Sequence, residues 1–461
     1  GPQLLREIKN LDKLFTSRSG SVAAVVGGSK VSTKVSILNN LIKKSDCIII
    51  GGAMANSFLY ANGQEIGHSM YQKDSKEIIW QIYSNAKKEN CEIILPVDAV
   101  IADSLHKPKI IEECLIRDVP ENKMILDTDT ANEIDDQFAL AWTLLSKDKI
   151  DLLGVTAEPY SFRHHKDELI EAFDIISNNK TIDNTKENLV SDYRSWVNGL
   201  IDANIHPNDI YFDTPEEGVE KSYQEIITIF KKLNIKHQGM VFRGSPKYLE
   251  NYNEPIVTES SKFIVDMCKK YSNEKIYVCA IGCLTNIASA LLTNPEIIKN
   301  LVVVWTSGFP TYSFNNNKNS LNLVQDVLAS QLLFECGVAH VYLPGFNVGA
   351  QLTLSLPDMK EFVKGRGEIG DYLYFLYTNN PLHKQRGVLD QSWRTWVIWD
   401  VINIAWLINP NWVPTKIINS SSLDNELYWI KNDSNNLIRE AFGVNRDEIF
   451  NDFFKKLNNL K

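Results

Sequence analysis

Short apolar runs alternate with amphipathic stretches along most of the chain, a pattern typical of a parallel sheet flanked by helices. Many of the runs end at glycine, aspartate or proline, the residues that often terminate strands. We therefore predict an α/β fold with an open, mostly parallel, Rossmann-like sheet. The runs predict strands at residues 22–26, 47–50, 92–95, 124–126, 152–155, 276–280, 301–305 and 340–343.

Two polar stretches, residues 178–186 and 314–320, interrupt this alternation and predict exposed loops. The length of 461 residues exceeds the usual size of one hydrophobic core, so two domains are expected. The 44% hydrophobic and 23% charged residues indicate a globular protein.

The charge pattern argues against nucleic acid as a partner, because the net charge is -9 and no basic run is long enough to follow phosphates. The apolar runs are far shorter than the roughly 20 residues that span a bilayer, so no membrane segment is predicted. No secretory signal follows Gly1, which favours a cytoplasmic protein. The seven scattered cysteines predict reduced core residues rather than disulfides or a zinc site.

Residues 22–34, VAAVVGGSKVSTK, predict a strand that ends in two glycines and leads into a helix, a geometry that suits phosphate binding. With the segments GPQLLREIKNL at the start, IIIGGAMANSFL at 48–59 and LPVDAVIAD at 95–103, residues 1–127 closely resemble the nucleotide-binding domain of phosphoglycerate kinase. The resemblance implies that the nucleotide would be contacted by Gly27, Gly28, Lys30, Lys34, Gly51 and Gly52.

This N-terminal fragment resembles only part of one kinase site, because the phosphoglycerate-binding domain and the later phosphate loop of that family are missing. Phosphoryl transfer requires two substrates and a metal to be positioned together, so we expect no kinase activity. A folded appendage is favoured over a weak nucleotide-binding site. Residues 124–126 can join only one sheet. We assign them to the second domain, place the boundary between 119 and 120, and expect an open edge on the first sheet.

Residues 124–140, MILDTDTANEIDDQFAL, place four acids, Asp127, Asp129, Asp135 and Asp136, where a strand passes into a helix. Clustered hard oxygen ligands at the carboxyl end of a parallel strand favour calcium or magnesium. Aspartates also cap helices, but one capping residue would suffice for that role.

The acidic motif resembles the calcium signature of nucleoside hydrolases, and the resemblance extends over residues 123–461. It is carried further by AIGCLTNIASAL at 280–291, SLNLVQDV at 320–327 and WDVINIAWLINP at 399–410. It implies the nucleoside hydrolase fold and a role in purine or pyrimidine salvage. Calcium would be held by Asp129, Asp136, Asp400 and the Thr285 carbonyl, with Asp135 close by, and Asp129 would take a proton from the attacking water.

The resemblance also implies a ribose contact for Asn322, and neighbouring residues extend the set of substrate-binding candidates to Asn132, Glu158 and Trp399. Three departures affect the site. Asn132 and Glu133 lengthen the acidic loop by about two residues relative to the family spacing. Ser320 stands where many relatives have a ribose-binding glutamate, and Trp399 stands where many have a histidine that protonates the base.

Several other side chains are open to two interpretations. Trp393, Trp396 and Trp399 recur at helical spacing, which favours core packing over base stacking. His164 and His165 are interpreted as exposed loop residues rather than as an alternative acid, and Tyr160 as a residue near the site. The three asparagines at 315–317 either contact substrate or form a turn.

Three functions compete on this evidence. The first is calcium-dependent hydrolysis of a ribonucleoside or related N-riboside to ribose and free base. The second is a catalytically weak or inactive metal-binding protein that binds a ribosyl ligand, favoured by Ser320 and Trp399. The third, phosphoglycerate kinase activity, is expected to fail. The expected partner is a small-molecule nucleoside, and homo-oligomer formation is left open.

Overall fold

A computed structural model describes residues 2–3, 5–6, 20–64, 66–67, 69–102, 111–115, 122–178, 185–388, 395–431 and 436–460. The chain divides into two compact units. The first comprises Gly1–Glu121 with Lys147–Lys149, and the second comprises Asn122–Ser146 with Ile150–Lys461. The motif at residues 1–11, most of the loop at 178–186, Asp103 and Trp393 lie wholly or partly outside the described residues.

The first unit contains a three-stranded parallel sheet in the order β1-β2-β3, formed by β1 (Ala23–Gly27), β2 (Cys47–Gly51) and β3 (Glu92–Ile94). Its core is formed by alternate strand residues, such as Val26 and Ile50, packed against helices. The helices are η1 (Ser32–Lys34), α2 (Val35–Ile42), α3 (Ala53–Ala61), η2 (Lys73–Ser75) and α4 (Lys76–Lys88). A separate antiparallel pair is formed by β4 (Asp98–Ala102) and β5 (Ile111–Leu115).

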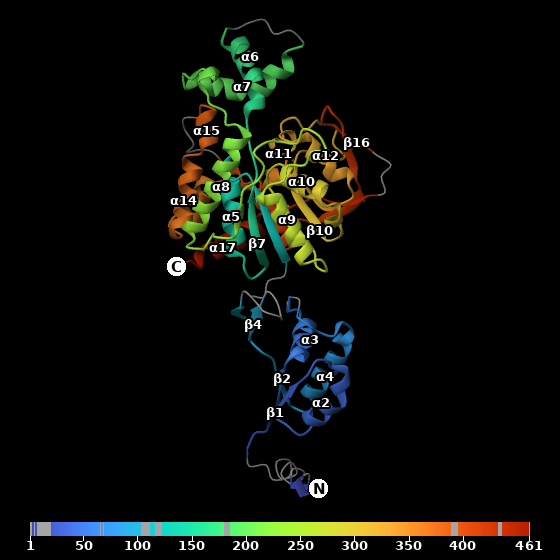
Figure 1. Cartoon of the computed structure of the whole chain (residues 1–461). Helices are drawn as coiled ribbons and strands as arrows, with labels where there is room; N and C mark the ends of the chain where they lie inside the picture. The colour runs from blue at the N-terminus through green and yellow to red at the C-terminus, as the bar shows by residue number, and fades with distance from the viewer. Residues whose placement is uncertain are drawn as a thin grey trace. The chain divides into compact units, whose positions relative to one another are not determined.

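The second unit is built on an eight-stranded sheet in the order β14-β17-β11-β10-β9-β6-β7-β8 (Figure 1). All neighbouring pairs are parallel except β14 with β17. The strands are β6 (Asn122–Thr128), β7 (Ile150–Ala157), β8 (Val241–Phe242), β9 (Ile276–Ala280), β10 (Leu301–Ser307), β11 (Ala339–Pro344), β14 (Thr415–Asn419) and β17 (Leu437–Ala441).

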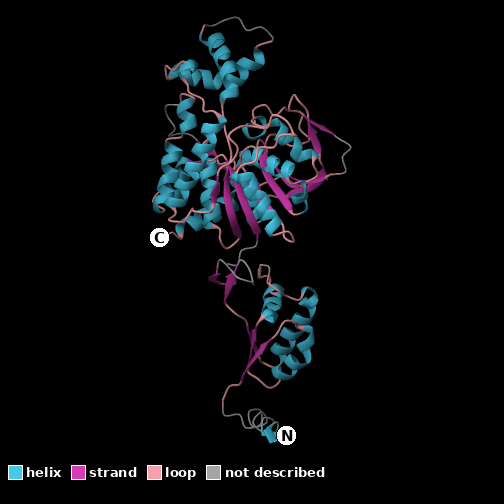
Figure 2. Cartoon of the chain, viewed as in Figure 1, coloured by secondary structure: helices cyan, strands magenta, loops and turns pink. Residues whose placement is uncertain are grey.

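Helices cover both faces of this sheet, because successive strand residues point to opposite sides (Figure 2). Met124 and Leu126 of β6 join one core cluster and Ile125 joins the other. The first cluster includes α5 (Asp135–Leu145), α8 (Pro215–Lys232), α14 (Gly367–Thr378), α16 (Val401–Ile408) and α17 (Arg446–Asn458). The second includes α9 (Glu259–Lys270), α10 (Thr285–Thr293) and α12 (Val327–Glu335).

A smaller helical layer carries its own core of aromatic residues, among them Tyr193, Trp196 and Phe212. It is formed by α6 (Lys166–Ser177) and α7 (Glu187–Asp202), with the short helix α15 (Pro381–Gln385) contributing Leu382. The unit also contains the short helices α11 (Leu321–Val324) and α13 (Leu356–Asp358) and two small antiparallel sheets. One sheet pairs β12 (Thr353–Ser355) with β13 (Thr395–Val397), which are distant in sequence, and the other is a hairpin of β15 (Ser421–Leu423) and β16 (Trp429–Lys431).

The predicted α/β class, the mostly parallel sheet and all eight predicted strands are confirmed. Residues 124–126 pair with β7 and β9, so their assignment to the second sheet is confirmed as well, whereas the boundary after residue 119 stays a prediction. Six of the seven cysteines, all except Cys114, are recorded as free thiols. In the described part of the chain, no helix is both long and apolar enough to cross a membrane.

Two sequence-based expectations were wrong. The helical spacing of Trp396 and Trp399 does not reflect a helix, because Trp396 lies in strand β13 and α16 begins only at Val401. The segment 314–320 is only partly exposed: Phe314 is 96% exposed, but Asn317 and Ser320 are buried. Both buried side chains hold the loop to backbone groups, which the polar composition alone does not reveal.

Candidate functional site

The carboxyl ends of β6 and β9 bring the acidic motif to the middle of the large sheet. Asp127 at the end of β6 is in register with Ala280 of β9, and the Ile281 N–H donates to the Asp127 carbonyl. Two residues further on, Asp129 is fully buried against Gly282. A Cβ atom on Gly282 would lie only 3.0 Å from the Asp129 carboxyl carbon, so a larger residue would have to displace that carboxylate.

Three further carboxylates meet at the start of two helices. Asp135 and Asp136 open α5, and Asp400 is the N-cap residue of α16, which packs against α5. One oxygen from each of Asp135, Asp136 and Asp400 lies within 4.8 Å of the others. All three residues are buried. The fold therefore joins acids that are more than two hundred positions apart in sequence, as the motif order predicted.

Burial and mutual repulsion both act on these groups. Burial raises the pKa of Asp129, Asp135, Asp136 and Asp400 well above the usual value, and the neighbouring carboxylates raise it further. The enclosed oxygens Asp129 Oδ1 and Asp136 Oδ2 have no hydrogen-bond partner. Buried carboxylates without a counter-charge are strongly destabilising, so this set of hard oxygen donors fits a divalent cation.

A fifth acid, Glu133, faces the same cluster from the loop that links β6 to α5. Its charge contributes to the raised pKa of Asp129, Asp135 and Asp136. Arg386, at the end of α15, is the cation whose charge acts on Glu133. Both groups keep an enclosed atom without a partner, Oε2 of the glutamate and Nε of the arginine. The two-residue extension of the loop thus adds a carboxylate to the site.

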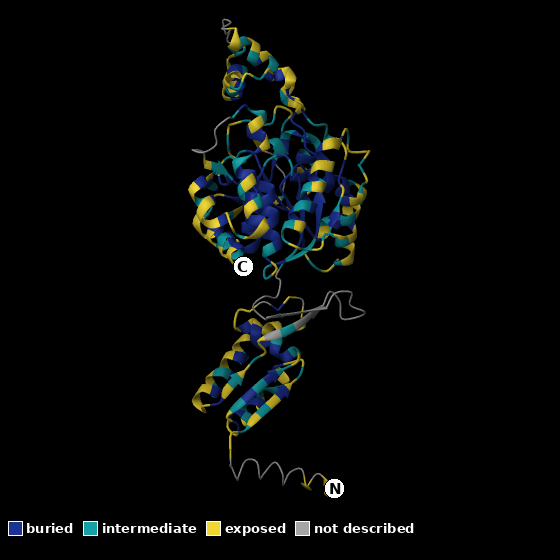
Figure 3. Cartoon of the chain, turned by 90° about the vertical axis from the view of Figure 1, so that its left-hand side faces the viewer, coloured by how far each residue is buried: buried dark blue, intermediate teal, exposed yellow. Residues whose placement is uncertain are grey.

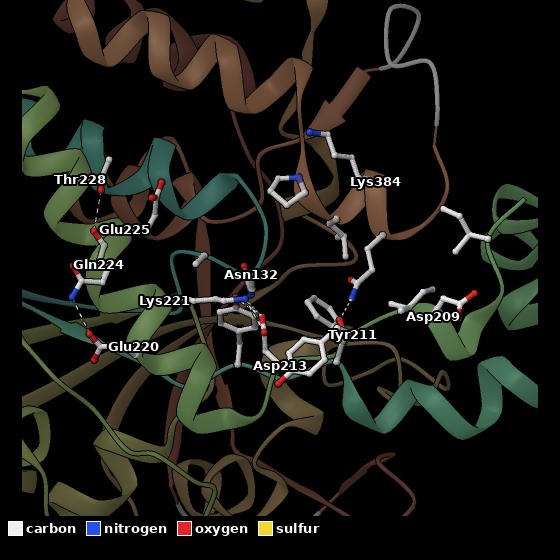
Figure 4. Close-up of a pocket in the computed structure, with 18 residues that line it drawn as sticks. Asn132, Asp209, Tyr211, Asp213, Glu220, Lys221, Gln224, Glu225, Thr228 and Lys384 are labelled. Carbon is white, nitrogen blue, oxygen red and sulfur yellow. Dashed lines mark hydrogen bonds and ion pairs between the residues drawn. The ribbon is translucent and has the colours of Figure 1, made fainter. Parts of the chain in front are cut away.

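Asn132, the other residue of that extension, donates a hydrogen bond of 2.7 Å from Nδ2 to Asp129 Oδ2. It also lines a cavity of about 730 Å³ in the second unit, between α8, the residues 205–213 and α15 (Figure 4). Tyr160 and Phe162 form part of its wall. The Asn132 side chain therefore connects the acidic cluster to a cavity large enough for a small ligand.

The cavity lining carries more acidic than basic side chains. Its carboxylates belong to Asp209, Asp213, Glu220 and Glu225, and its ammonium groups to Lys221 and Lys384. Lys221 Nζ lies 2.7 Å from Asp213 Oδ1, an ion pair drawn in Figure 4. The Tyr160 hydroxyl donates to the same carboxylate at 3.2 Å.

Glu158 lies deeper than predicted. It is fully buried after β7, where the Asn286 N–H donates to Oε1 at 3.0 Å and the Cys283 thiol approaches Oε2 at 3.2 Å. Burial raises its pKa well above normal, and Asp127 raises it further. Glu158 does not line the described cavity, so its predicted substrate contact stays a prediction.

Two asparagines tie the strand ends together at this edge. Asn322 Nδ2 donates to the Ile281 carbonyl at 2.9 Å, and Asn403 Nδ2 donates to the carbonyls of Ala280 and Val304 at 3.0 and 2.8 Å. Asn403 Oδ1 is buried without a partner. Sequence reasoning missed Asn403, although its position three residues after Asp400 places both on one side of α16.

Thr285 and Ser320 are both engaged in the framework. Thr285 opens α10, and its hydroxyl donates to Asp326 Oδ2 at 2.7 Å. Ser320 Oγ accepts a hydrogen bond from the Gly308 N–H at 2.8 Å and lies 2.7 Å from Ser307 Oγ. The serine that replaces a glutamate in the family pattern is therefore fixed beneath the loop that follows β10.

Aromatic side chains border the carboxyl edge beside Asp400. Phe309 follows β10, Phe346 follows β11 and Trp399 precedes Asp400. The Phe309 and Phe346 rings are 4.9 Å apart and those of Phe346 and Trp399 6.1 Å apart, both edge to face. All three residues, which we call the aromatic trio, are half-buried. Trp399 thus contacts other aromatics near the site rather than a closed core.

The remaining polar candidates lie away from the acids. His164 is exposed, and His165 is half-buried with Nδ1 2.7 Å from the Tyr193 hydroxyl. Burial lowers the pKa of His165 to about 3, so it is neutral at ordinary pH. Asn315 is exposed and Asn316 is half-buried, whereas Asn317 Oδ1 accepts from the Phe309 N–H at 2.7 Å.

In the first unit, the predicted nucleotide-contacting glycines meet at adjacent strand ends. Gly27 is in register with Gly51, and the Met54 N–H donates to the Gly28 carbonyl at 2.7 Å. Gly52 has a φ of 65°, a conformation that favours glycine, and the Lys34 side chain approaches Gly28. Lys30 accepts a hydrogen bond from the Thr33 hydroxyl through its carbonyl.

Comparison with known families gives two matches. The family model for inosine-uridine preferring nucleoside hydrolase matches residues 196–446, and the model for phosphoglycerate kinase matches residues 1–155. A phosphoglycerate kinase from a Chelativorans species is 44% identical over 127 residues, which are 28% of this chain and 32% of the relative. The chain thus spans about a third of the curated relatives that it matches.

Solved structures were compared as well. A purine-preferring ribonucleoside hydrolase from Gardnerella vaginalis aligns with a TM-score of 0.49 at 20% identity, covering 74% of this chain and 99% of that chain. An inosine-uridine preferring nucleoside hydrolase from Bacillus anthracis aligns with a TM-score of 0.45 at 16% identity, covering 73% and 99%. Phosphoglycerate kinase from Coxiella burnetii aligns with a TM-score of 0.25 at 32% identity, covering 34% and 38%.

Proposed function

This chain belongs to the inosine-uridine preferring nucleoside hydrolase family, and we propose that it hydrolyses an N-riboside to ribose and free base with the help of a calcium ion. The proposal depends on one observation above all: the buried carboxylates of Asp135, Asp136 and Asp400 meet within 4.8 Å of one another, and the buried Asp129 acts electrostatically on Asp136 and Asp400. A structural role alone would not favour such a cluster, because each buried charge destabilises the fold.

Asp135, Asp136 and Asp400 would hold the ion, together with Asp129 and, as the family pattern implies, the Thr285 carbonyl. When bound, calcium supplies a fixed positive charge that orients ribose hydroxyls and makes a bound water more acidic. Hard oxygen donors of this kind favour calcium or magnesium over softer metals. Among them, the proposal commits to calcium.

Asp129 is placed to accept the proton of the attacking water. Its Oδ2 is oriented by Asn132, and its Oδ1 is enclosed without a partner. A base held in this way needs little reorganisation during the reaction. As the C1′–N bond breaks, the sugar acquires oxocarbenium character, which the remaining carboxylates offset. Asn322, in α11, is the proposed ribose contact; its side chain donates to the Ile281 carbonyl after β9 and to the Thr306 carbonyl in β10.

A second candidate function is binding without efficient turnover. It is favoured by Ser320, whose hydroxyl is occupied by Ser307 and Gly308 and therefore offers no carboxylate to the ribose. Loss of a charge-assisted hydrogen bond weakens ligand binding. Glu133, in the same loop as Asp129, adds a carboxylate to the cluster, and the proposed enzyme would rely on it in place of the missing glutamate.

The test is a reducing-sugar assay on the full chain with a panel of nucleosides, in calcium and in chelator. We expect ribose from at least one nucleoside, loss of activity in chelator and recovery on adding calcium. Asp129→Asn is the catalytic control and Asp447→Asn, on the surface of α17, is its matched control. If calcium raises the melting temperature but no nucleoside releases ribose, the binding function is the correct one.

A further inference from the structure

The groups around the acidic cluster carry an excess of negative charge. Five carboxylates converge there, from Asp129, Glu133, Asp135, Asp136 and Asp400. Among the described residues, the cation that acts on this set is Arg386, through Glu133. A divalent cation and Arg386 together would offset three of the five charges. The adjoining cavity adds more carboxylates than ammonium groups, so its field attracts positively charged ligands.

The proton-bearing groups near Asp129 are already committed to other acceptors. The Tyr160 hydroxyl donates to Asp213, the Tyr248 hydroxyl donates to Gln325 Oε1 at 2.7 Å, and the Cys283 thiol lies against Glu158. His165 Nδ1 lies 2.7 Å from the Tyr193 hydroxyl. None of these four side chains is therefore free to protonate a departing base.

An aromatic surface borders the acidic cluster beside Asp400. The aromatic trio, Phe309, Phe346 and Trp399, is half-buried and adjoins Asp400. Its frame is rigid: the Phe346 N–H donates to the Gly308 carbonyl at 3.0 Å, and the Phe309 N–H donates to Asn317. Aromatic faces grouped beside carboxylates are the arrangement that recognises an organic cation.

On these grounds we propose that the preferred substrate is an N-riboside whose base carries a permanent positive charge, such as a pyridinium or an N-alkylated purine. This inference rests on the proposed hydrolase function and names its substrate class. A neutral base leaves as an anion unless it is protonated, whereas a cationic base leaves as a neutral molecule. The lack of a free acid is therefore no obstacle to a cationic substrate.

The chemical step balances without an additional reactant. The water oxygen forms a bond to C1′ while the C1′–N bond breaks, and the bonding electron pair moves to the ring nitrogen, which loses its positive charge. The Asp129 carboxylate takes the water proton. The products are ribose and a neutral base. During this step the aromatic trio would hold the base through cation–π contact, which weakens as the charge disappears and favours release.

Binding is tested separately from reactivity, because a charged base is also intrinsically a better leaving group. The calcium-loaded Asp129→Asn variant is titrated with nicotinamide riboside and with its dihydro form, which has the same size but no charge. We expect the charged form to bind about tenfold more tightly. Trp399→Leu should reduce that preference to about twofold or less, while Trp80→Leu, an exposed tryptophan in the first unit, should leave it unchanged.

Turnover is then compared for the wild-type chain with nicotinamide riboside, inosine and uridine. The inference predicts a kcat/KM for nicotinamide riboside that exceeds the other two by at least about tenfold, and Trp399→His should raise kcat only for the neutral nucleosides. The inference is overturned if the charged and dihydro forms bind equally well, or if Trp399→Leu lowers the affinity for both forms by the same factor. In that case, ribose release from inosine or uridine would still support the hydrolase function. Absence of ribose from every N-riboside would instead reject the proposed function.

Discussion

The two units build their polar sites in different ways, one from residues that are close in sequence and the other from residues that are far apart. In the first, Gly27, Gly28, Gly51 and Gly52 lie on two adjacent strands that are close in sequence, and Lys34 approaches them from the next helix. In the second, acids from β6, α5 and α16 come together across most of the chain length. The first needs only local structure to form, whereas the second forms only when a complete sheet has assembled.

This difference distinguishes an isolated piece of local structure in the first unit from a site that the whole fold of the second unit assembles. The glycine-rich strand ends of the first unit stand on a three-stranded sheet with Val25 75% exposed on β1. The acids of the second unit are buried, and Figure 3 shows the dark blue, buried interior of that unit between helices with exposed outer faces. Retained local geometry does not indicate retained function, whereas convergent burial of like charges favours the binding of a cation.

The largest effect is expected from removing the base. Asp129→Ala should lower kcat for ribose release by about a thousandfold or more, because it removes both a general base and a charge near the reacting carbon. The effect is measured by steady-state assay with the best nucleoside of the panel. If Lys34→Ala in the first unit lowers kcat as much as Asp129→Ala does, the claim that only the second unit carries the catalytic site is wrong.

The next effect concerns the ion. Asp400→Asn should weaken calcium binding by about a hundredfold, because it withdraws one charged ligand while retaining the shape of the N-cap residue. Isothermal titration of chelator-treated protein measures the affinity, with Asp447→Asn as the control. Equal calcium affinity in Asp400→Asn and wild type would mean that the ion binds elsewhere.

The pH dependence of stability should also distinguish the two units. Since burial and mutual repulsion raise the pKa values of Asp129, Asp135, Asp136 and Asp400, the folded calcium-free chain binds more protons than the unfolded chain above the ordinary carboxyl pKa of about 4. Without calcium, the second unit should therefore be most stable below a pH of about 4. Its stability should fall as the pH rises through the raised pKa values of these aspartates.

Calcium should remove this loss, because it favours the ionised carboxylates. We expect the calcium-induced rise in melting temperature to grow as the pH is raised from about 5 to about 8. Differential scanning calorimetry in calcium and in chelator provides the values, and the transition of the first unit is the internal reference. A calcium shift that is constant or shrinks over this range contradicts the ionised cluster as the binding site.

A smaller effect is expected at Ser320. Restoring the family glutamate with Ser320→Glu should lower the free energy of unfolding by about 2 kcal/mol, because a charge would be buried where Ser307 and the Gly308 N–H now bind a hydroxyl. It should not raise kcat/KM. Denaturant unfolding and the ribose assay test this together, and Ser313→Glu on the loop surface is the matched control. A gain in activity would show that residue 320 can face the ribose.

The smallest effects belong to the first unit. Lys34→Ala should leave ribose release within about twofold of wild type, because Lys34 belongs to the first unit and the proposed catalytic acids to the second. Addition of ATP with magnesium should produce neither ATP turnover with phosphoglycerate nor a shift in the melting transition of this unit. A saturable shift that Lys34→Ala abolishes would show that the glycines and lysine still bind nucleotide.

Much of the fold was predictable because its strands are short apolar runs bounded by glycine, aspartate or proline. Three strands of the large sheet, β8, β14 and β17, were missed. The residues of β14, TKIIN, include only two adjacent apolar side chains, and the strand lies at the sheet edge beside β17. Trp396 was misjudged because a spacing of three residues also suits a strand followed by a turn. Packing partners, which the sequence alone does not identify, decided both cases.

The site was predictable where a motif carried it and unpredictable where only the fold brings residues together. The meeting of Asp136 with Asp400 followed from motif order and is present. Arg386 had no motif and lies among ordinary polar residues, so its electrostatic contact with Glu133 emerges only from the arrangement of α15 beside the acidic loop. The buried position of Glu158 likewise depends on Asn286 and Cys283, residues of another strand and helix.

The central claim is that one calcium ion held by the buried acids makes this chain an N-riboside hydrolase. It is tested most directly by adding calcium stepwise to chelator-treated protein and measuring bound calcium and ribose release on the same samples. We predict that both rise together and level off at one ion per chain. Full ribose release before any calcium is bound, or one bound ion without ribose release from any N-riboside, would contradict it.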